Sequence, residues 1–393
     1  MNAQLAYDFL TPHKIVFGWG RRREVGVLGR SLGRRAFLVC GLPPEVAADV
    51  TAEITDLLRA EGLEAIPLAT LVHEPEVADV DRVAGEIRGH QATDGDFLLA
   101  VGGGAAIDLA KATAAMATNR QSPTVQDYLE NVGRDLKLSQ RPLPLLAMPS
   151  TAGTGAEATK NAVISSYDPP FKKSLRDDRL MPRIALVDPE LTVTVPPQVT
   201  ATSGMDAITQ LIESYVSRKS QPIPRALAVQ GLKMAVPAIA EAVENPSARS
   251  AREAMAHAAL LSGMALANSG LGMAHGVAAA LGTHCRVPHG AACALMLPAA
   301  IHANMAAKEA DFARLNHLLF SRNAKHPADA AGAFLEEIEK LCDRVGVPRR
   351  LTQVGVSREQ IPMLVQSSRG TSMSANPREL TDAELTAILE GLL

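Results

Sequence analysis

Four residues in the second half of the chain have the types and spacing of a metal-binding site. Asp206 and Gln210 lie four positions apart, so on a helix a carboxylate and an amide oxygen would share one face. His275 and His289 would lie about 21 Å apart on a straight continuous helix, which is too far for one ion. If the chain bends between them, these four side chains form a ligand set for a divalent transition metal.

The interval between the two histidines contains residues that allow such a bend. Gly282 lacks a side chain, and Pro288 lacks a backbone donor and interrupts regular helix. We therefore expect the chain to turn back in this interval and to bring both imidazoles to one place.

A glycine-rich segment in the first half has the features of a phosphate-binding loop. Residues 96–101 are strand-like and lead directly into Gly102, Gly103 and Gly104, which are followed by a helical pattern over residues 105–118. Glycines let the backbone approach a pyrophosphate, and the free N–H groups of a helix start bind the anion. The alternative is a tight turn that binds nothing.

A second loop, residues 149–157, also follows a predicted strand. It is rich in hydroxyl groups and glycine, which suits it to bonding phosphate oxygens or a carboxamide. The simpler alternative is a capped turn, because Ser and Thr favour such positions. Two loops of this kind at strand ends favour a dinucleotide over either loop taken alone.

The elements that must position these residues differ between the two halves. Strand-like and helical patterns alternate up to about residue 188, and only helical patterns follow from about residue 200. We therefore predict a Rossmann-like α/β domain with a parallel sheet over residues 1–195 and an all-α metal-binding domain over residues 196–393. The predicted strands are residues 35–40, 63–68, 96–101, 143–148 and 183–187, and the predicted helices of this domain are residues 46–61, 77–89 and 105–118.

Composition limits the classes of protein to which the chain can belong. A length of 393 residues favours two domains over one core. A formal net charge of −3 and an aromatic content of 3% argue against nucleic-acid binding and against a basic membrane patch. We find no Cys-x-x-Cys spacing, no signal-peptide pattern and no apolar stretch of about 20 residues, which favours a cytoplasmic protein.

Taken together, these segments resemble the iron-containing (group III) alcohol dehydrogenase family. The resemblance covers nearly the whole chain, and its motifs occur in order and at family-like spacing. The motifs are Val16-Phe17-Gly18-Trp19-Gly20, residues 102–111, residues 149–157, Leu186-Val187-Asp188-Pro189, residues 204–213, His275, Pro288-His289-Gly290 and Asn376-Pro377-Arg378.

This resemblance implies a dehydroquinate synthase-like architecture and an oxidoreductase. The enzyme would interconvert a small alcohol and its aldehyde or ketone by hydride transfer with NAD or NADP. Asp206, His275 and His289 match three family metal ligands, for Fe²⁺ or alternatively Zn²⁺, and the ion would act as a Lewis acid on the substrate oxygen. The family also suggests a homodimer or a higher homo-oligomer.

Residues that match or adjoin family cofactor contacts occur in four places. An acidic residue at position 41 would bind the adenosine ribose and repel a 2′-phosphate, so the glycine there admits NADP, with Arg34 or Arg35 as a source of positive charge. The predicted cofactor-binding residues are Gly41 after the first predicted strand, Gly102, Gly103, Gly104 and Asp108 in the glycine loop, Ser150, Thr151 and Thr154 in the second loop, and Lys172, or in the adjoining register Lys173.

Two positions depart from the family pattern near the metal. Gln210 stands where the family has histidine, and an amide is a weaker donor than imidazole to late transition metals. We interpret Gln210 as a ligand, the alternative being a surface-facing glutamine beside a three-ligand ion. Ala279 stands where alcohol-active members have a second histidine that helps to relay the proton, so we assign no catalytic acid or base.

Three neighbours of these residues have simple interpretations. Glu213 could support the metal shell, although a carboxylate on the helix face is the simpler role. Cys285 and Cys293 flank His289, but neither fits the ligand pattern of the family, and we interpret both as small buried residues.

Three other functions stay open from the sequence. An oxo-acid reductase of the maleylacetate reductase type would keep the fold and cofactor but would need cationic side chains for a carboxylate. A lyase of the dehydroquinate synthase type would need clustered Lys, Arg and Asn, which we do not see around residues 204–213. A non-catalytic nucleotide-binding protein is suggested by Gln210 and Ala279 together.

Overall fold

The computed structural model describes residues 6–320 and 326–393, which form two compact units. The α/β unit comprises Pro12–Val195, and the helical unit comprises Pro196–Leu393 together with the segment that precedes Pro12. In that segment the backbone N–H of Leu10 donates to Asn268 Oδ1 at 2.7 Å, and Asn268 Nδ2 donates to the carbonyl of Leu10 at 2.8 Å. Residues 6–11 therefore belong with the helices, whereas the sequence had assigned them to the α/β domain.

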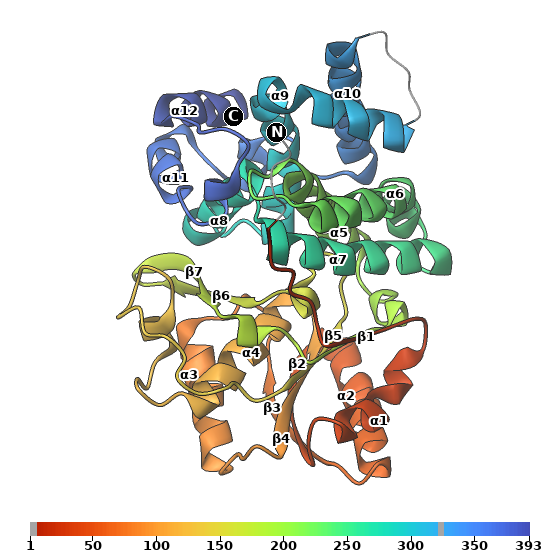
Figure 1. Cartoon of the computed structure of the whole chain (residues 1–393), viewed down its shortest axis with the longest axis vertical. Coiled ribbons are helices and arrows are strands. Elements are labelled where there is room, and N and C mark those ends of the chain that lie inside the picture. The colour runs from red at the N-terminus through yellow and green to blue at the C-terminus, as the bar shows by residue number, and fades with distance from the viewer. Residues whose placement is uncertain (1–5, 321–325) are drawn as a thin grey trace. The chain divides into compact units, whose positions relative to one another are not determined.

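The α/β unit is built on a six-stranded, fully parallel sheet with helices on both sides (Figure 1). The strand order is β1-β8-β5-β4-β2-β3. Helices follow four of the strands as crossover connections, so the predicted fold class is confirmed. The strands are β1 (Lys14–Phe17), β2 (Arg35–Gly41), β3 (Glu64–Thr70), β4 (Asp96–Gly102), β5 (Leu145–Pro149) and β8 (Ile184–Val187), and the helices are α1 (Val25–Arg30), α2 (Pro44–Ala60), α3 (Val77–Gly89) and α4 (Gly104–Thr118).

Both faces of this sheet are buried, which explains the continuous apolar runs of the central strands. Phe37 and Val39 of β2 belong to the core that α3 and α4 share with one face. Leu38 and Cys40 alternate with them and belong to the core formed with α1 and α2 on the opposite face. The period of two along a strand thus supplies two cores from one segment.

The chain changes direction between β2 and β4. From β2 it continues to β3 on one side, and from β4 it continues to β5 on the other. Gly41 is in register with Gly102, and Gly102 with Pro149, so the carboxyl ends of three neighbouring strands meet there. This switch point of an open parallel sheet is where such folds bind ligands. A Cβ atom on Gly41 would lie 2.5 Å from the Cβ of Ala106, so the start of α4 lies against the end of β2.

The sequence did not predict β1 or an antiparallel hairpin of two further strands, β6 (Asn161–Tyr167) and β7 (Pro170–Arg176). The register pairs Ser165 with Lys172, which places Lys172 on the second strand of the hairpin. A signal was present, because an Asp-Pro-Pro turn joins two segments of mixed apolar and polar residues.

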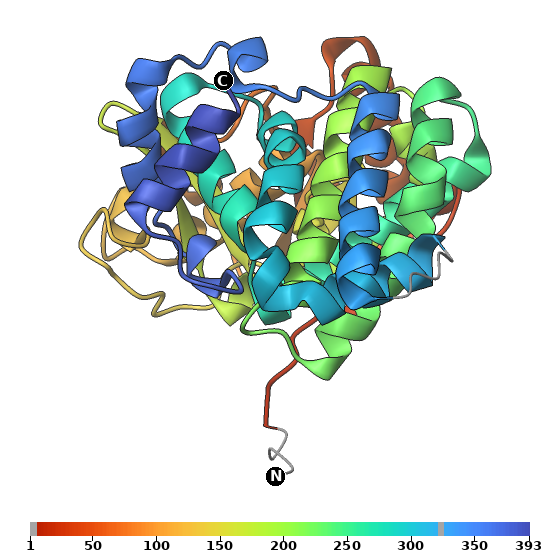
Figure 2. The same cartoon turned by 90° about the horizontal axis from the view of Figure 1, so that it is seen from above.

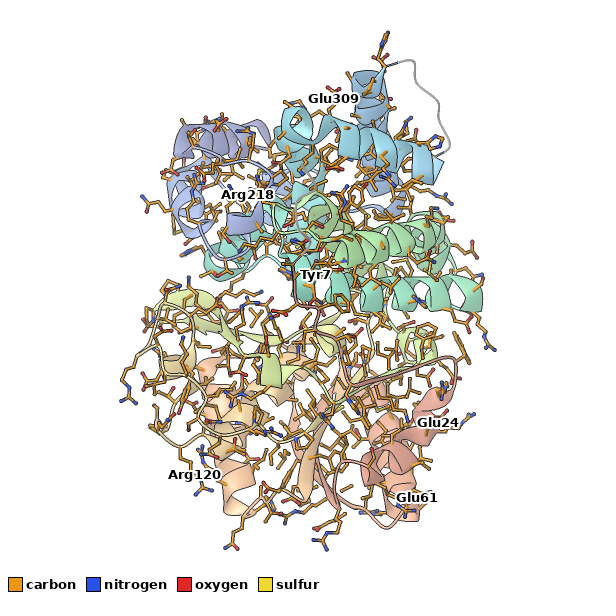
Figure 3. All side chains as sticks on the ribbon, viewed as in Figure 1. Tyr7, Glu24, Glu61, Arg120, Arg218 and Glu309 are labelled. Carbon is orange, nitrogen blue, oxygen red and sulfur yellow. The ribbon has the colours of Figure 1, made fainter. Side chains whose placement is uncertain are left out.

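In the described part of the helical unit every regular element is a helix, as predicted. Helix α5 is central, because it packs against α6, α7 and α9 (Figure 2). Exposed charged side chains such as Arg218 cover the outside of this unit, as Arg120 does on the α/β unit (Figure 3). The α-helices are α5 (Pro197–Val216), α6 (Pro222–Glu244), α7 (Arg249–Ser269), α8 (Met273–Cys285), α9 (His289–Phe320, with a break at Lys308), α10 (Pro327–Val345), α11 (Ile361–Ser367) and α12 (Asp382–Gly391).

By length and composition alone, α6 and α9 could cross a membrane. The expectation that the chain has no apolar stretch of this length is therefore wrong. Such helices are weak indicators, because the core helix of a soluble protein has the same composition. In α9, 61% of the most apolar window is buried inside the structure, so packing in the core accounts for its apolar character.

Replacement of Gly41 by alanine tests the close approach of β2 to α4. The added methyl group would overlap the side chain of Ala106, and we expect the free energy of unfolding to fall by about 1–3 kcal/mol. The control is Gly85→Ala in α3, where the nearest atom to a new Cβ is 3.8 Å away. There we expect a gain of about 0.5–1 kcal/mol, because alanine favours helix over glycine. Equal urea midpoints for the two variants would contradict this packing.

Candidate functional site

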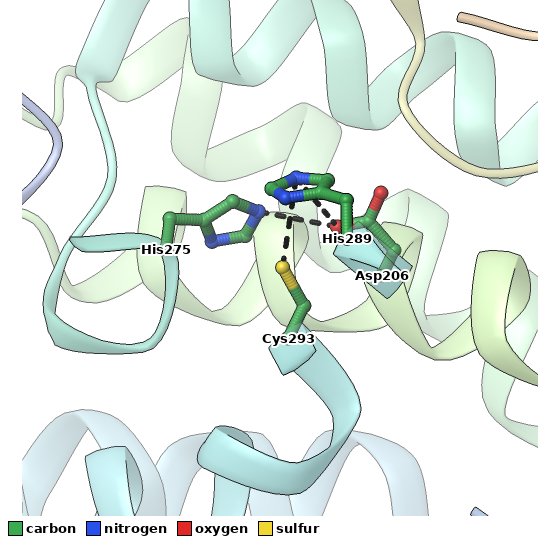
Figure 4. Close-up of side chains that lie close together, drawn as sticks. All are labelled: Asp206, His275, His289 and Cys293. Atoms are coloured by element: carbon green, nitrogen blue, oxygen red, sulfur yellow. Dashed lines mark hydrogen bonds and ion pairs between the residues drawn. The ribbon is translucent and has the colours of Figure 1, made fainter. Parts of the chain in front are cut away.

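Side chains from three helices of the helical unit converge on one point (Figure 4). His275 Nε2, from α8, lies 3.2 Å from Oδ1 of Asp206 on α5. His289 Nε2, from the first residue of α9, lies 3.9 Å from the same oxygen. The Sγ atom of Cys293 lies 3.6 Å from His289 Nε2, and the donor atoms of all four residues lie within 4.8 Å of one another. Such a cluster can hold a metal ion.

A sharp turn between α8 and α9 brings the two histidines together. Helix α8 ends at Cys285, Arg286 adopts the left-handed conformation with φ 54°, and Pro288 precedes the start of α9. The bend expected between Gly282 and Pro288 exists and lies next to Pro288, whereas Gly282 lies inside α8. The reversal depends on one non-glycine residue at positive φ, which is uncommon and cannot be recognised from residue type.

Glu213 holds His275 in place. Its Oε2 atom accepts a hydrogen bond from His275 Nδ1 at 2.7 Å. The same carboxylate accepts the backbone N–H groups of Gly272 at 3.0 Å and Ala274 at 2.7 Å, at the start of α8. Because a carboxylate can only accept, Nδ1 of His275 carries a proton, and Nε2 is left to face Asp206 and a metal ion.

Asn376 completes this support from the other end of the chain. Its Oδ1 atom accepts the backbone N–H of Met273 at 3.1 Å and the Nδ2 group of Asn304 at 3.0 Å. Its own Nδ2 group donates to Asn304 Oδ1 at 2.9 Å. The Asn376-Pro377-Arg378 motif thus ties the start of α8 to α9, and the sequence had given it no role.

The charges around the cluster favour a cation. Burial alone would raise the pKa of Asp206, but His289 and His275 lower that pKa below its ordinary value, so Asp206 is a carboxylate. Burial alone would lower the pKa of His275, but Cys293, Asp206 and Glu213 raise it well above its ordinary value. A carboxylate and two imidazoles whose donor atoms converge on one point are typical ligands of a divalent transition metal, so the donor set fits a metal.

Gln210 lies one turn beyond Asp206 on α5 and is buried, not surface-facing. Its Oε1 atom accepts a hydrogen bond from the hydroxyl of Ser262 at 3.1 Å. That hydrogen bond uses the same amide oxygen that would ligate a metal. Ligation by Gln210 stays a prediction.

The positions of Cys293 and Glu213 beside the cluster indicate larger roles than we predicted for them from the sequence. Cys293 follows His289 by four residues on α9, so the two share a helix face. Glu213 follows Asp206 by seven residues, two turns along α5. Helical spacing could therefore have placed both near the metal ligands. Burial raises the pKa of the Cys293 thiol to about 12, with Asp206 adding to the rise and His275 opposing it.

In the α/β unit, the two predicted phosphate loops lie against each other. Gly103 caps α4, and a Cβ atom on it would lie 3.4 Å from Thr151 Oγ1. A Cβ atom on Gly104 would lie 2.5 Å from Thr154 Oγ1. The backbone N–H of Ser150 donates to the carbonyl of Gly102 at 2.9 Å. The free N–H groups at the start of α4 and two threonine hydroxyls are thus close neighbours, as an anion site requires.

Two other predicted cofactor residues have partners within the protein. The side chain of Asp108 on α4 is 14% exposed and accepts the backbone N–H of Val163 at 3.0 Å, and partial burial raises its pKa. Lys172 forms an ion pair with Glu74 at 2.6 Å. Both contacts hold the β6–β7 hairpin to the rest of this unit. Contact of either residue with a cofactor stays a prediction.

The suggestion that Arg34 or Arg35 supports a phosphate beside Gly41 is wrong. Arg35 begins β2, and its guanidinium pairs with Asp96 at 2.7 Å, whereas Gly41 ends the same strand. Six residues of strand separate the two ends by about 20 Å. The arginines therefore lie at the amino edge of the sheet, opposite the edge where the glycine loops lie.

Both halves of the chain match family models of known proteins. The model described as iron-containing alcohol dehydrogenase matches residues 12–189. The model described as Fe-containing alcohol dehydrogenase family, C-terminal, matches residues 200–393.

Individual relatives align over almost the whole chain. It is 32% identical to long-chain-alcohol dehydrogenase 1 of Geobacillus thermodenitrificans over 95% of this chain and 93% of that protein. It is 30% identical to the NAD-dependent methanol dehydrogenase of Bacillus methanolicus, with 98% and 100% covered. The structure of an alcohol dehydrogenase from Oenococcus oeni superposes with a TM-score of 0.91 at 29% identity, covering 99% of this chain and 100% of that chain.

Replacement of Glu213 by glutamine tests the support of His275. The amide keeps the size but loses one acceptor, so one of three buried donors would lose its partner. We expect metal affinity to fall by about 10- to 100-fold, as is usual when the partner of a ligating histidine is changed. Titration against a competing chelator measures this fall. The control, Glu336→Gln, changes an exposed carboxylate on α10. If both variants bind metal like the unaltered protein, Glu213 does not support the site.

Replacement of Glu157 by glutamine tests whether burial keeps this carboxyl group protonated in the folded protein. Burial raises the pKa of Glu157 from 4.5 to about 7, so its carboxyl group is protonated in the folded chain at a pH where it is ionised in the unfolded chain. The free energy of unfolding should therefore fall between pH 4.5 and 7, by up to about 1.4 kcal/mol per pH unit, and level off above. Glu157→Gln should remove this slope, and Glu45→Gln, at an exposed site, should keep it. Urea unfolding at several pH values measures both, and an unchanged slope in Glu157→Gln would refute the assignment.

Proposed function

The chain belongs to the iron-containing alcohol dehydrogenase family, as its motifs predicted, and we propose that it interconverts a small alcohol and its aldehyde or ketone. Both family matches and the aligned relatives identify it as an oxidoreductase. The observation that carries the proposal is the convergence of Asp206, His275 and His289, whose donor atoms can hold one ion.

The chemistry has two parts, each with its own group of residues. A divalent ion, Fe²⁺ or alternatively Zn²⁺, supplies Lewis acidity toward the substrate oxygen, and NAD or NADP supplies or accepts the hydride. Asp206, His275 and His289 would hold the ion, and Gln210 is one candidate for a fourth ligand. Glu213 would keep His275 in the tautomer that leaves Nε2 free to bind.

The cofactor would bind through backbone groups of the glycine loop. The N–H groups at Gly103 and Gly104 and the positive end of the α4 dipole suit the pyrophosphate. Thr151 and Thr154 would add hydroxyl donors from the neighbouring loop, beside Ser150. Asp108 and Lys172 would act mainly by holding the hairpin in position.

The end of β2 determines which dinucleotide is admitted. Position 41 has no room for a side chain, because a Cβ atom would lie 2.5 Å from Ala106. A carboxylate that would repel a 2′-phosphate is thereby excluded at this position. We propose that the enzyme accepts NADP as well as NAD. Neither Arg34 nor Arg35 lies near position 41, so neither would favour NADP over NAD.

Two further parts of the proposal come from the family resemblance. We propose a cytoplasmic enzyme that forms a homodimer or a higher homo-oligomer. The sheet has β1 and β3 at its edges, and an edge strand offers unpaired backbone groups to a second copy. Light scattering of the purified chain measures the oligomeric state.

The decisive experiment is an activity assay on metal-free and reloaded protein. Protein stripped by a chelator should not oxidise NADH or NADPH, and anaerobic addition of Fe²⁺ or Zn²⁺ should restore the loss of reduced-nicotinamide absorbance. A panel of aldehydes, ketones and oxo acids distinguishes alcohol chemistry from oxo-acid reduction. If the reloaded protein, with its metal occupancy confirmed, is inactive with every compound of the panel, the proposal is refuted.

The variant His289→Ala separates the two parts of the site. We expect metal-restored activity to fall by at least about 100-fold, because Lewis-acid stabilisation is worth several kcal/mol. Cofactor affinity, measured by calorimetry, should stay within a factor of two, since the glycine loops belong to the other unit. The control, His302→Ala, alters an exposed histidine on the same helix. Equal loss of cofactor affinity in His289→Ala would contradict this division.

A further inference from the structure

We propose that Cys293 is a ligand of the metal ion, which makes the site a carboxylate, two imidazoles and a thiolate. This inference rests on the proposed function, because it concerns the ion held by Asp206, His275 and His289. It places a soft sulfur donor where we had predicted the amide oxygen of Gln210, at the position where the family has histidine.

The geometry of the four donors carries the inference. Donors about 2.0–2.3 Å from a tetrahedral ion lie about 3.3–3.6 Å from one another. Three of the six separations among them are 3.2 Å between His275 and Asp206, 3.9 Å between His289 and Asp206, and 3.6 Å between Cys293 and His289. All donors lie within 4.8 Å of one another, so small side-chain adjustments suffice to surround one ion.

The positions of the side chains support sulfur over the amide at position 210. In Figure 4 the Sγ atom of Cys293 points toward the imidazoles of His275 and His289. The thiol is fully buried, and the rigid face of α9 that it shares with His289 fixes its direction. The Oε1 atom of Gln210 accepts a hydrogen bond from Ser262, which uses one of its two lone pairs.

A thiolate changes what the site should bind. Metal coordination deprotonates a thiol, so the ligand set of Asp206 and Cys293 would carry two negative charges that neutralise a divalent ion. Soft sulfur donors favour Zn²⁺, and tetrahedral nitrogen–sulfur sets are typical of zinc. The chain should therefore retain Zn²⁺ more firmly than a site with only oxygen and nitrogen donors would.

Absorption of the cobalt-loaded protein tests the ligand directly. Co²⁺ bound to a thiolate gives a sulfur-to-metal charge-transfer band in the near ultraviolet, and we expect this band in the stripped protein reloaded with Co²⁺. Cys293→Ser should lose the band. The matched control is Cys342→Ser, because Cys342 is equally buried, lies on α10 of the same unit and should leave the band unchanged.

X-ray absorption of the zinc-loaded, unaltered protein tests the same ligand without a mutation that could impair folding. We expect a sulfur shell at about 2.3 Å beside the oxygen and nitrogen shell. One bound ion with metal-restored turnover but no sulfur shell would overturn the role of Cys293 and leave the proposed function standing. A chain that retains no metal would overturn both.

Discussion

A single buried carboxylate, that of Glu213, holds the helical unit in the arrangement on which the candidate metal site depends. It accepts two backbone N–H groups at the start of α8 and the Nδ1 proton of His275. The first N–H groups of a helix have no partner within the helix, and a negative charge there is attracted to the positive end of the helix dipole. One group on α5 thus fixes the start of α8, the orientation of an imidazole and the nitrogen that it presents to an ion.

The candidate anion site of the α/β unit depends on backbone groups more than on side chains. Its glycines matter for what they leave out, because a Cβ atom at Gly41 or Gly104 would collide with Ala106 or Thr154. The six-stranded sheet places these segments at the carboxyl ends of adjacent strands. Side-chain donors would therefore form the metal site, whereas glycines, which lack side chains, would leave room for the anion.

Periodicity and residue type predicted most of the fold and part of the site. The central strands were recognisable as continuous apolar runs, because each contributes side chains to the cores on both faces of the sheet. Their alternation with helical patterns was recognisable as well. The convergence of Asp206, His275 and His289 was implied by resemblance, since sequence spacing does not reveal which helices pack together. Glu213 meets His275 across 62 positions of sequence, so its role depends on tertiary packing. The left-handed Arg286 was also hidden, because residue type does not specify a rare backbone conformation.

The donors of the candidate metal site come from α5, α8 and α9, so a bound ion would cross-link three helices as well as take part in the reaction. An ion that binds the folded chain and not the unfolded chain adds its binding free energy to the stability of the fold, in proportion to the logarithm of its free concentration. The abundance of the enzyme in a cell would then depend on the supply of the metal. Starvation for the metal would remove the protein itself, through unfolding and proteolysis, in addition to silencing its chemistry.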